Sequence, residues 1–285
     1  MLAAKDLLSK DYISIDVNST VAKLFGAFKK AKVSWALIFE GKKFVGIISK
    51  DWLLTIRFDP DAMRIKNALK HRAKVKTPPQ VPKLSLSTPL PKICHFLYTS
   101  NMHALPVFEK NKLVGVVKAS DVLKALADEF KGIAAKEFAK IPAITIDQKE
   151  RIAKAIRIMF RSGIDRLPVV DDSGKLVGIL TMHDLIERFY AHQQMCKGVR
   201  ISTAASHRSY PKSGPIGEKT EFGQIEVCSI ISPWPMTYEA TKETKIEKII
   251  EMMRAKGVCS IILVEEEKPI GILCMRDILK TGASL

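Results

Sequence analysis

The chain has 285 residues, of which 47% are hydrophobic and 27% charged, and its formal net charge is +16. This is the composition of a folded soluble protein long enough for two ordinary domains, and no apolar run approaches the roughly 18 residues of a transmembrane helix. The first residues, MLAAKDLLSKD, carry charge where a signal peptide needs its apolar core, so we expect a cytoplasmic protein without membrane contact.

The five cysteines form no CxxC pair and show no zinc-type spacing with the histidines. Their count is odd, and each lies in or near an apolar stretch. We therefore expect buried free thiols in a reducing compartment and no metal site.

Four parts of the chain share one glycine-centred block: KFVGIISKDWLL, KLVGVVKASDVL, KLVGILTMHDLI and KPIGILCMRDIL. A second apolar block precedes each of them (KVSWALIF, NMHALPVF, GIDRLPVV and GVCSIILV), after a helix-period segment and a short extended piece. Each unit predicts strand, helix, strand, tight turn, strand and helix, an α/β (α+β) arrangement. A unit of about 55 residues buries such elements poorly by itself, so we expect the units to pair.

We place the four repeats at 1–57, 72–130, 132–192 and 225–282, paired into two pseudo-symmetric modules, 1–131 and 132–285. Residues 195–224, rich in Gly, Ser and Pro, predict a basic loop or insertion between repeats 3 and 4. Two stretches without any acidic residue, 62–108 and 188–217, follow repeats 1 and 3 in equivalent places. Such stretches attract polyanions, although an ordinary soluble basic surface has the same composition.

The stretch GILTMHD, residues 178–184, places Thr181 and Asp184 three residues apart where a strand gives way to a helix. A capping box explains this spacing without any ligand. A hydroxyl and a carboxylate at a helix N-terminus can also hold a phosphate and a ribose diol. An aspartate recurs at the same offset in two other repeats, as Asp121 and Asp277, and this recurrence favours the ligand in repeat 3.

The four units resemble CBS domains, and a tandem pair resembles a Bateman module, because the blocks G-h-h-[ST]-x-x-D and h-P-V-h recur in order with matching helices. The chain is similar to archaeal and bacterial proteins with four CBS repeats and to the gamma subunit of AMP-activated protein kinase. The resemblance implies a regulatory protein that binds AMP, ADP, ATP or S-adenosylmethionine in clefts between paired repeats. It implies no other cofactor. We also expect a homodimer and a regulated partner protein.

In repeat 3 the resemblance assigns phosphate or ribose oxygens to Thr181, ribose hydroxyls to Asp184 and a phosphate to Arg166. Residues of the extended piece would line the base, and these are Pro142, Ala143 and Thr145. His183 could approach a phosphate, although a histidine in the first helical turn more often faces solvent.

Repeats 2 and 4 keep the aspartate but change its surroundings. Lys118 replaces the hydroxyl residue in repeat 2 and Cys274 replaces it in repeat 4. Lys118 and His103 together would suit an anion in repeat 2, and the other candidates in these two repeats are Asp121, Arg276 and Asp277. Repeat 1 has Trp52 in the place of the aspartate, so we expect no nucleotide there.

Two other functions stay open. The basic connectors could bind nucleic acid, although the sequence shows no aromatic stacking platform and no DNA-reading helix. The chain could also be a structural or adaptor protein with empty clefts. No catalytic motif stands out, and in GPIGEKT, residues 214–220, a glutamate interrupts the pattern of a phosphate-binding loop, so we do not expect an enzyme.

Overall fold

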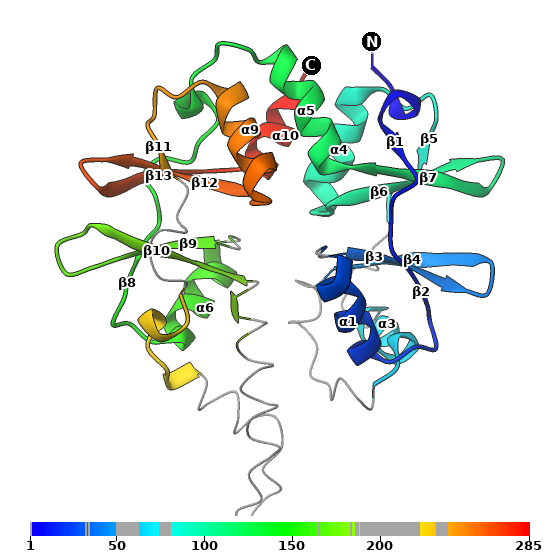
Figure 1. Ribbon diagram of the computed structural model, residues 1–285, viewed down its shortest axis with the longest axis horizontal. Coiled ribbons are helices and arrows are strands. Elements are labelled where there is room, and N and C mark those ends of the chain that lie inside the picture. The colour runs from blue at the N-terminus through cyan, green and yellow to red at the C-terminus, as the bar shows by residue number, and fades with distance from the viewer. Residues whose placement is uncertain are drawn as a thin grey trace, which may run out of the picture. The chain divides into compact units, whose positions relative to one another are not determined.

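The structure is a computed structural model that describes residues 2–31, 33, 35–49, 63–73, 81–162, 164, 166–182, 184–185, 188, 223–231 and 239–285 (Figure 1). Its contacts divide the chain into two compact units. The first contains Met1–Ile141, Ala240–Leu263 and Ile272–Leu285, and the second contains Pro142–Glu239 and Val264–Gly271. No described helix has the length and apolar character needed to cross a membrane.

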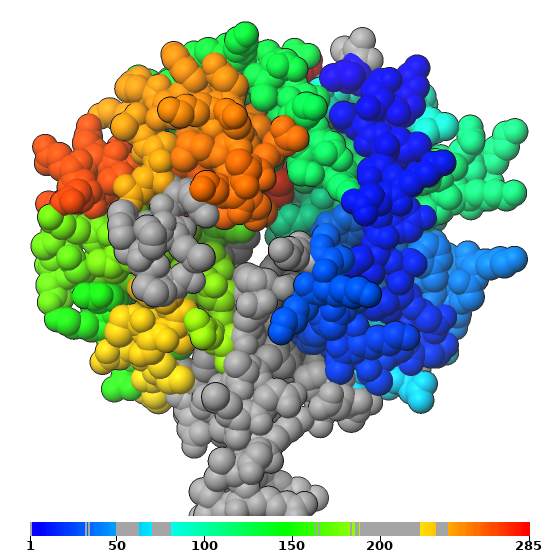
Figure 2. All heavy atoms as spheres, viewed as in Figure 1, coloured from blue at the N-terminus to red at the C-terminus, as the bar shows by residue number. Residues whose placement is uncertain are grey.

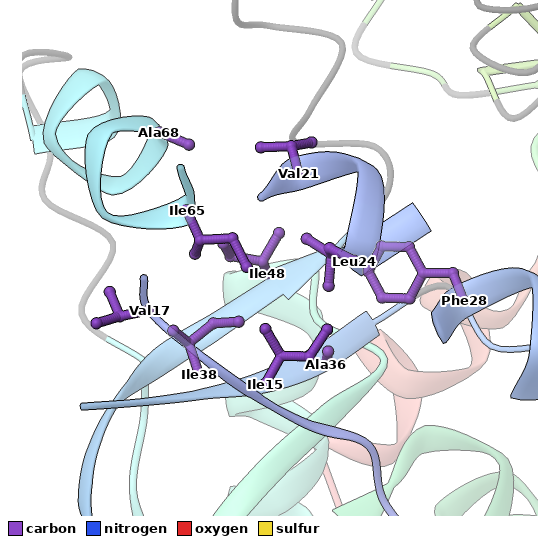
Figure 3. Close-up of a cluster of buried hydrophobic side chains, with 10 residues drawn as sticks. All are labelled: Ile15, Val17, Val21, Leu24, Phe28, Ala36, Ile38, Ile48, Ile65 and Ala68. Atoms are coloured by element: carbon purple, nitrogen blue, oxygen red, sulfur yellow. The ribbon is translucent and has the colours of Figure 1, made fainter. Parts of the chain in front are cut away.

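Repeat 1 forms a sheet in the order β2-β3-β4, with β2 parallel to β3 and β4 antiparallel to β3. Its elements are β2 (Ser14–Asp16), α1 (Val21–Ala31), β3 (Trp35–Glu40) and β4 (Lys43–Ser49). The buried residues of α1 are Val21, Leu24 and Phe28, which share one face of a 3.6-residue helix and pack on the sheet (Figure 3). A later helix, α3 (Ile65–Ala73), adds Ile65 to the same core.

Repeat 2 has a four-stranded sheet in the order β1-β7-β6-β5. Its elements are β5 (Leu84–Ser85), α4 (Leu90–Ser100), β6 (Ala104–Glu109), β7 (Lys112–Lys118) and α5 (Ala119–Glu129). The extra edge strand comes from the start of the chain, where η1 (Ala4–Leu7) leads into β1 (Leu8–Ser9). In Figure 2 this N-terminal segment, in dark blue, lies on the surface beside repeats 1 and 2.

Repeats 3 and 4 follow the same plan, with sheets in the orders β10-β9-β8 and β11-β12-β13. Repeat 3 contains η2 (Ala135–Glu137), β8 (Ile146–Asp147), α6 (Ile152–Ser162), β9 (Arg166–Val170), β10 (Leu176–Thr181) and, after the long interval, η3 (Val227–Ser229). Repeat 4 contains β11 (Glu239–Ala240), α9 (Ile246–Lys256), β12 (Ser260–Glu265), β13 (Lys268–Cys274) and α10 (Met275–Gly282).

The sheets of repeats 1 and 2 share a core, because alternate residues of a strand point to opposite faces. In β3, Ala36 and Ile38 face the helices of repeat 1, whereas Trp35 and Leu37 pack in a cluster with Ala104 and Val116 of repeat 2. This packing shows the expected pairing of adjacent repeats in the first unit.

Leading segments are exchanged between neighbouring repeats. Isolated β-bridges join Ala3 to Pro89, Thr20 to Arg64, Ala134 to Lys245 and Arg151 to Glu226. Each repeat is therefore bridged to the short segment that precedes its neighbour: repeat 2 to the segment before repeat 1, repeat 1 to the segment before repeat 2, and repeats 4 and 3 likewise. Helix α3 lies largely between the predicted repeats 1–57 and 72–130 yet packs on repeat 1, so the repeat and module boundaries remain predictions. The predicted insertion 195–224 lies outside the described residues except for its last two positions.

Candidate ligand sites

The structure brings Thr181, Arg166 and Asp184 together in repeat 3. Thr181 ends β10 directly opposite Arg166 of β9 in the antiparallel register. Residues that face each other in such a pair lie on one face of the sheet, with Cβ atoms about 5 Å apart. Asp184 follows in the next turn, and all three side chains are half-buried. The Thr181 hydroxyl and the Asp184 carboxylate are therefore in contact where the strand ends, and Arg166 lies opposite Thr181 on the neighbouring strand.

The capping box is present in this junction. The Thr181 N–H donates to Asp184 Oδ2 at 2.8 Å, and the Thr181 hydroxyl donates to the same oxygen at 2.6 Å. In return, the Asp184 N–H donates to Thr181 Oγ1 at 3.1 Å. These bonds occupy Oδ2, and within the described part of the chain no hydrogen bond reaches Oδ1. The cap therefore orients the carboxylate and leaves it one oxygen with which to accept hydrogen bonds from a ribose.

The junction of repeat 2 replaces this local pair with a long-range one. Lys118 ends β7 opposite Ala104, and it is the N-cap residue of α5 without a side-chain capping bond. Its Nζ lies 2.6 Å from Oδ2 of Asp11, whose carboxylate is exposed and whose amide is held by Ser9 Oγ at 3.2 Å. The hydrogen bond and the charge of Lys118 lower the pKa of Asp11 below its ordinary value.

Two further candidates lie at the same junction of repeat 2. The carbonyl of His103 accepts the Ala119 N–H at 2.9 Å, so this residue adjoins the start of α5. Asp121 lies half-buried in the first turn of α5. The positions predicted for an anion-binding site are thus neighbours in space.

In repeat 4 a carboxylate is held at the junction. The Cys274 N–H donates to Asp277 Oδ2 at 2.9 Å, and Lys140 Nζ lies 3.5 Å from Asp277 Oδ1. Arg276 turns toward repeat 2, where its Nε donates to the Tyr98 carbonyl at 3.2 Å and its guanidinium lies 5.0 Å from the centre of the Tyr98 ring. The two candidates of this repeat therefore contact different elements.

The extended piece proposed to line the base lies along two sheets. Ala143, next to Pro142, donates its N–H to the Ile270 carbonyl of β13 at 3.0 Å, so this part of the piece borders repeat 4. Thr145 immediately precedes β8, which pairs in parallel with β9, the strand of Arg166. His183 and Trp52 lie outside the described residues, as does most of the basic stretch 188–217.

Sequence reasoning missed Asp11 and Lys140. Asp11 lies just after β1, which precedes the core of repeat 1 but pairs with β7 of repeat 2. Lys140 lies in the segment that begins repeat 3 but pairs with β13 of repeat 4. The only sequence signal was the alignment of the extended pieces DYISID and IPAITID, which does not show the sheet edge that receives each piece.

The expectation of buried thiols is confirmed for Cys94 and is wrong for Cys228, which is exposed. Burial raises the pKa of the Cys94 thiol to about 12, which keeps it protonated and unreactive. Cys94, Cys228, Cys259 and Cys274 form no disulfide bond, and the part of the chain that the structure describes contains no group of three potential metal ligands.

Four units of strand, helix, strand and strand define a protein built from α/β repeats. The model of the CBS domain family matches residues 4–51, 75–128, 135–191 and 239–284, which together exceed half of the chain. The chain belongs to the CBS domain family, as the repeated blocks predicted.

Solved structures show the same fold. Protein MJ1225 from Methanocaldococcus jannaschii, described as a candidate archaeal homologue of g-AMPK, superimposes with a TM-score of 0.70 at 22% identity over 98% of this chain and 99% of that chain. A conserved uncharacterised protein from Pyrococcus horikoshii gives a TM-score of 0.61 at 16% identity over 99% and 100%. The predicted fold of four paired repeats is confirmed.

Sequence relatives share parts of the chain. Protein MJ1225 is 28% identical over 185 residues, which are 64% of this chain and 59% of that protein. An inosine-5'-monophosphate dehydrogenase from Thermoplasma acidophilum is 36% identical over 107 residues, 37% of this chain and 21% of the enzyme. The chain thus spans less than two thirds of either of these relatives.

Proposed function

We propose that the chain is a regulatory protein that binds an adenosine-containing ligand, AMP, ADP, ATP or S-adenosylmethionine, at the strand-to-helix junctions of its CBS repeats. The observation that carries this proposal is the convergence of Thr181, Asp184 and Arg166 in repeat 3. It is supported by the family and by the similarity to a protein described as a candidate homologue of the AMP-activated protein kinase gamma subunit.

Each residue of repeat 3 has a distinct task in this proposal. Asp184, fixed through Oδ2 by the cap, accepts hydrogen bonds from the ribose hydroxyls through its other oxygen. Arg166 offers a planar fork of donors that suits a phosphate or a carboxylate. The piece from Pro142 to Thr145 lines the base, and His183 adjoins the phosphate.

Repeats 2 and 4 offer further sites with other chemistry. In repeat 2, His103 and Lys118 supply donors to an anion beside Asp121. In repeat 4, Asp277 receives the ribose. Repeat 1, with Trp52 in place of the aspartate, binds no nucleotide.

Regulation follows from differences in affinity between conformations. A ligand that binds one arrangement of the repeats more tightly shifts the population toward that arrangement, and a partner protein recognises it. A ligand with equal affinity for both arrangements would transmit nothing. We propose that the chain acts in the cytoplasm as a homodimer with such a partner and performs no catalysis itself.

Isothermal titration calorimetry tests this function. Wild-type protein is titrated with AMP, ADP, ATP and S-adenosylmethionine after removal of co-purified ligand. We expect saturable binding of at least one of them, which Asp184→Ala abolishes at one site. Asp172→Ala is the matched control, because Asp172 lies in the same repeat and forms an exposed ion pair with Lys149 away from the junction. Absence of heat with all four ligands, or identical titrations of both variants, would contradict the proposal.

A further inference from the structure

Lys140 belongs to the leading segment of repeat 3 but lies at the junction of repeat 4. Its N–H donates to the Ile272 carbonyl at 3.0 Å, and its carbonyl accepts the Ile272 N–H at 3.2 Å. These two bonds fix the backbone of Lys140 along β13, two residues before the end of that strand. The ammonium lies 3.5 Å from Asp277 Oδ1. A cation is therefore held beside the carboxylate proposed to bind a ribose.

The two partners of this ion pair differ in exposure. The Lys140 side chain is 60% exposed, whereas the Asp277 side chain is only 11% exposed. Asp277 is also fixed by the Cys274 N–H through its other oxygen. The carboxylate is thus the rigid member, and the lysine is a flexible point charge that can move to another anion at little cost.

Among the described residues of repeat 4, the positions of Thr181 and Arg166 in repeat 3 are held by Cys274 and Ser260. Cys274 takes the place of Thr181, and a thiol is a weak hydrogen-bond donor. The neighbouring cation, Arg276, contacts Tyr98 instead. A site built on Asp277 therefore needs another positive group if its ligand carries a phosphate.

The fold itself does not require a lysine at this position. Ser9 occupies the equivalent place in repeat 2, where it lies opposite Val116 of β7 as Lys140 lies opposite Ile272 of β13. Both segments form the same edge pairing with a different side chain. The charge of Lys140 is therefore a feature of the site in repeat 4 and not of the sheet.

We infer that Lys140 determines the specificity of the repeat 4 site, selecting a phosphorylated adenosine ligand over adenosine and over a cationic sulfonium ligand. The inference rests on the proposed function. The ribose hydroxyls donate to Asp277 and replace its contact with the ammonium, and the released lysine pairs with the phosphate of the same ligand. Without a phosphate, the ligand must break the ion pair and gains no contact with the released ammonium in return.

Calorimetric titration with AMP and with adenosine tests this role in the full chain carrying Asp184→Asn, which removes the repeat 3 carboxylate. We expect Lys140→Gln to weaken AMP binding about tenfold, corresponding to one charge-assisted contact, and to change adenosine binding less than about twofold. Lys140→Arg keeps the charge and is expected to restore most of the AMP affinity.

The matched control is Lys136→Gln, which makes the same charge change in the same leading segment. Lys136 pairs with Glu243 at 2.9 Å, away from Asp277, so neither titration should change. Equal losses for AMP and adenosine in Lys140→Gln would show that Lys140 merely positions Asp277, and unchanged AMP binding would also overturn the inference. If Asp277→Asn leaves the AMP titration unaltered, repeat 4 is not a site, and the proposed function fails there together with the role of Lys140.

Discussion

Repeats 2 and 3 begin their second helix in the same register but stabilise the junction in different ways. In repeat 3, two residues three positions apart, Thr181 and Asp184, satisfy each other within one turn. In repeat 2, Lys118 at the same place binds Asp11, which is 107 residues away in the sequence. The first junction is complete as soon as its own strand and helix form. The second depends on the exchanged N-terminal segment.

Local contacts therefore fix the strand-to-helix junction of repeat 3, whereas tertiary contacts fix that of repeat 2. A local cap orients Asp184 whether or not the neighbouring repeat is in place. In repeat 2 the charge at the junction depends on how firmly β1 pairs with β7. Changes that loosen β1 should therefore affect repeat 2 and leave repeat 3 alone.

The largest effect is expected from Gly115→Ala in β7. A Cβ at this position would lie 2.7 Å from the Ser9 carbonyl oxygen, a backbone atom, and 2.8 Å from Leu8 Cδ1, so β1 must shift. Overpacking of this kind costs about 1–3 kcal/mol, and we expect a loss near the upper end in the free energy of unfolding by urea denaturation.

Gly46→Ala is the matched control for that substitution, because Gly46 is the equivalent glycine of repeat 1. Among the described residues, nothing lies within 4 Å of a Cβ placed there. We expect a change within about 0.5 kcal/mol. Equal urea midpoints for the two variants would show that β1 does not restrain repeat 2.

A smaller effect should distinguish the two aspartates in the absence of ligand. Asp184→Ala removes a carboxylate that accepts two hydrogen bonds at the helix start, and we expect a loss of about 1–2 kcal/mol in the free energy of unfolding. Asp121→Ala removes only a favourable charge near a helix N-terminus, so a loss of about 0.5 kcal/mol is expected. Similar losses in denaturant titrations would mean that the junctions do not differ as proposed.

The repeat pattern predicted the fold because each unit encodes its own periodicities. Val21, Leu24 and Phe28 mark a helix face in the sequence, and the glycine-centred block marks the hairpin that follows. The capping pair Thr181 and Asp184 was predictable for the same reason, since both partners lie in one short motif.

The ion pairs Asp11–Lys118 and Lys140–Asp277 were not predictable in this way. Each joins a leading segment to a neighbouring repeat, and the choice of sheet edge is decided by packing between repeats rather than by local spacing. The aligned pieces around Asp11 and Pro142 have the same extended character but different charges. Their contribution to a site becomes visible only once the receiving strand is known.

The smallest effect concerns the acid titration of Asp11. Its pKa is lowered by the hydrogen bond and the charge of Lys118, so this ion pair stabilises the folded chain above pH 3.8, the ordinary value, and the contribution is lost as the pH falls through the lowered pKa. We expect Lys118→Met to return the pKa of Asp11 toward 3.8, measured by NMR of the carboxyl carbons.

Asp16 provides the internal control in the same spectra. Its pKa is lowered chiefly by the backbone N–H of Asn18, which donates to Oδ1 at 2.8 Å, and Lys118 plays no part. Salt at 1 M shortens the Debye length to about 3 Å and weakens the attraction between exposed charges, so it should raise the pKa of Asp11 more than that of Asp16. If Lys118→Met changes the pKa of both carboxyl groups or of neither, the ion pair does not control the junction of repeat 2. A pKa change confined to Asp11 would show that the N-terminal segment determines the charge at the junction of repeat 2.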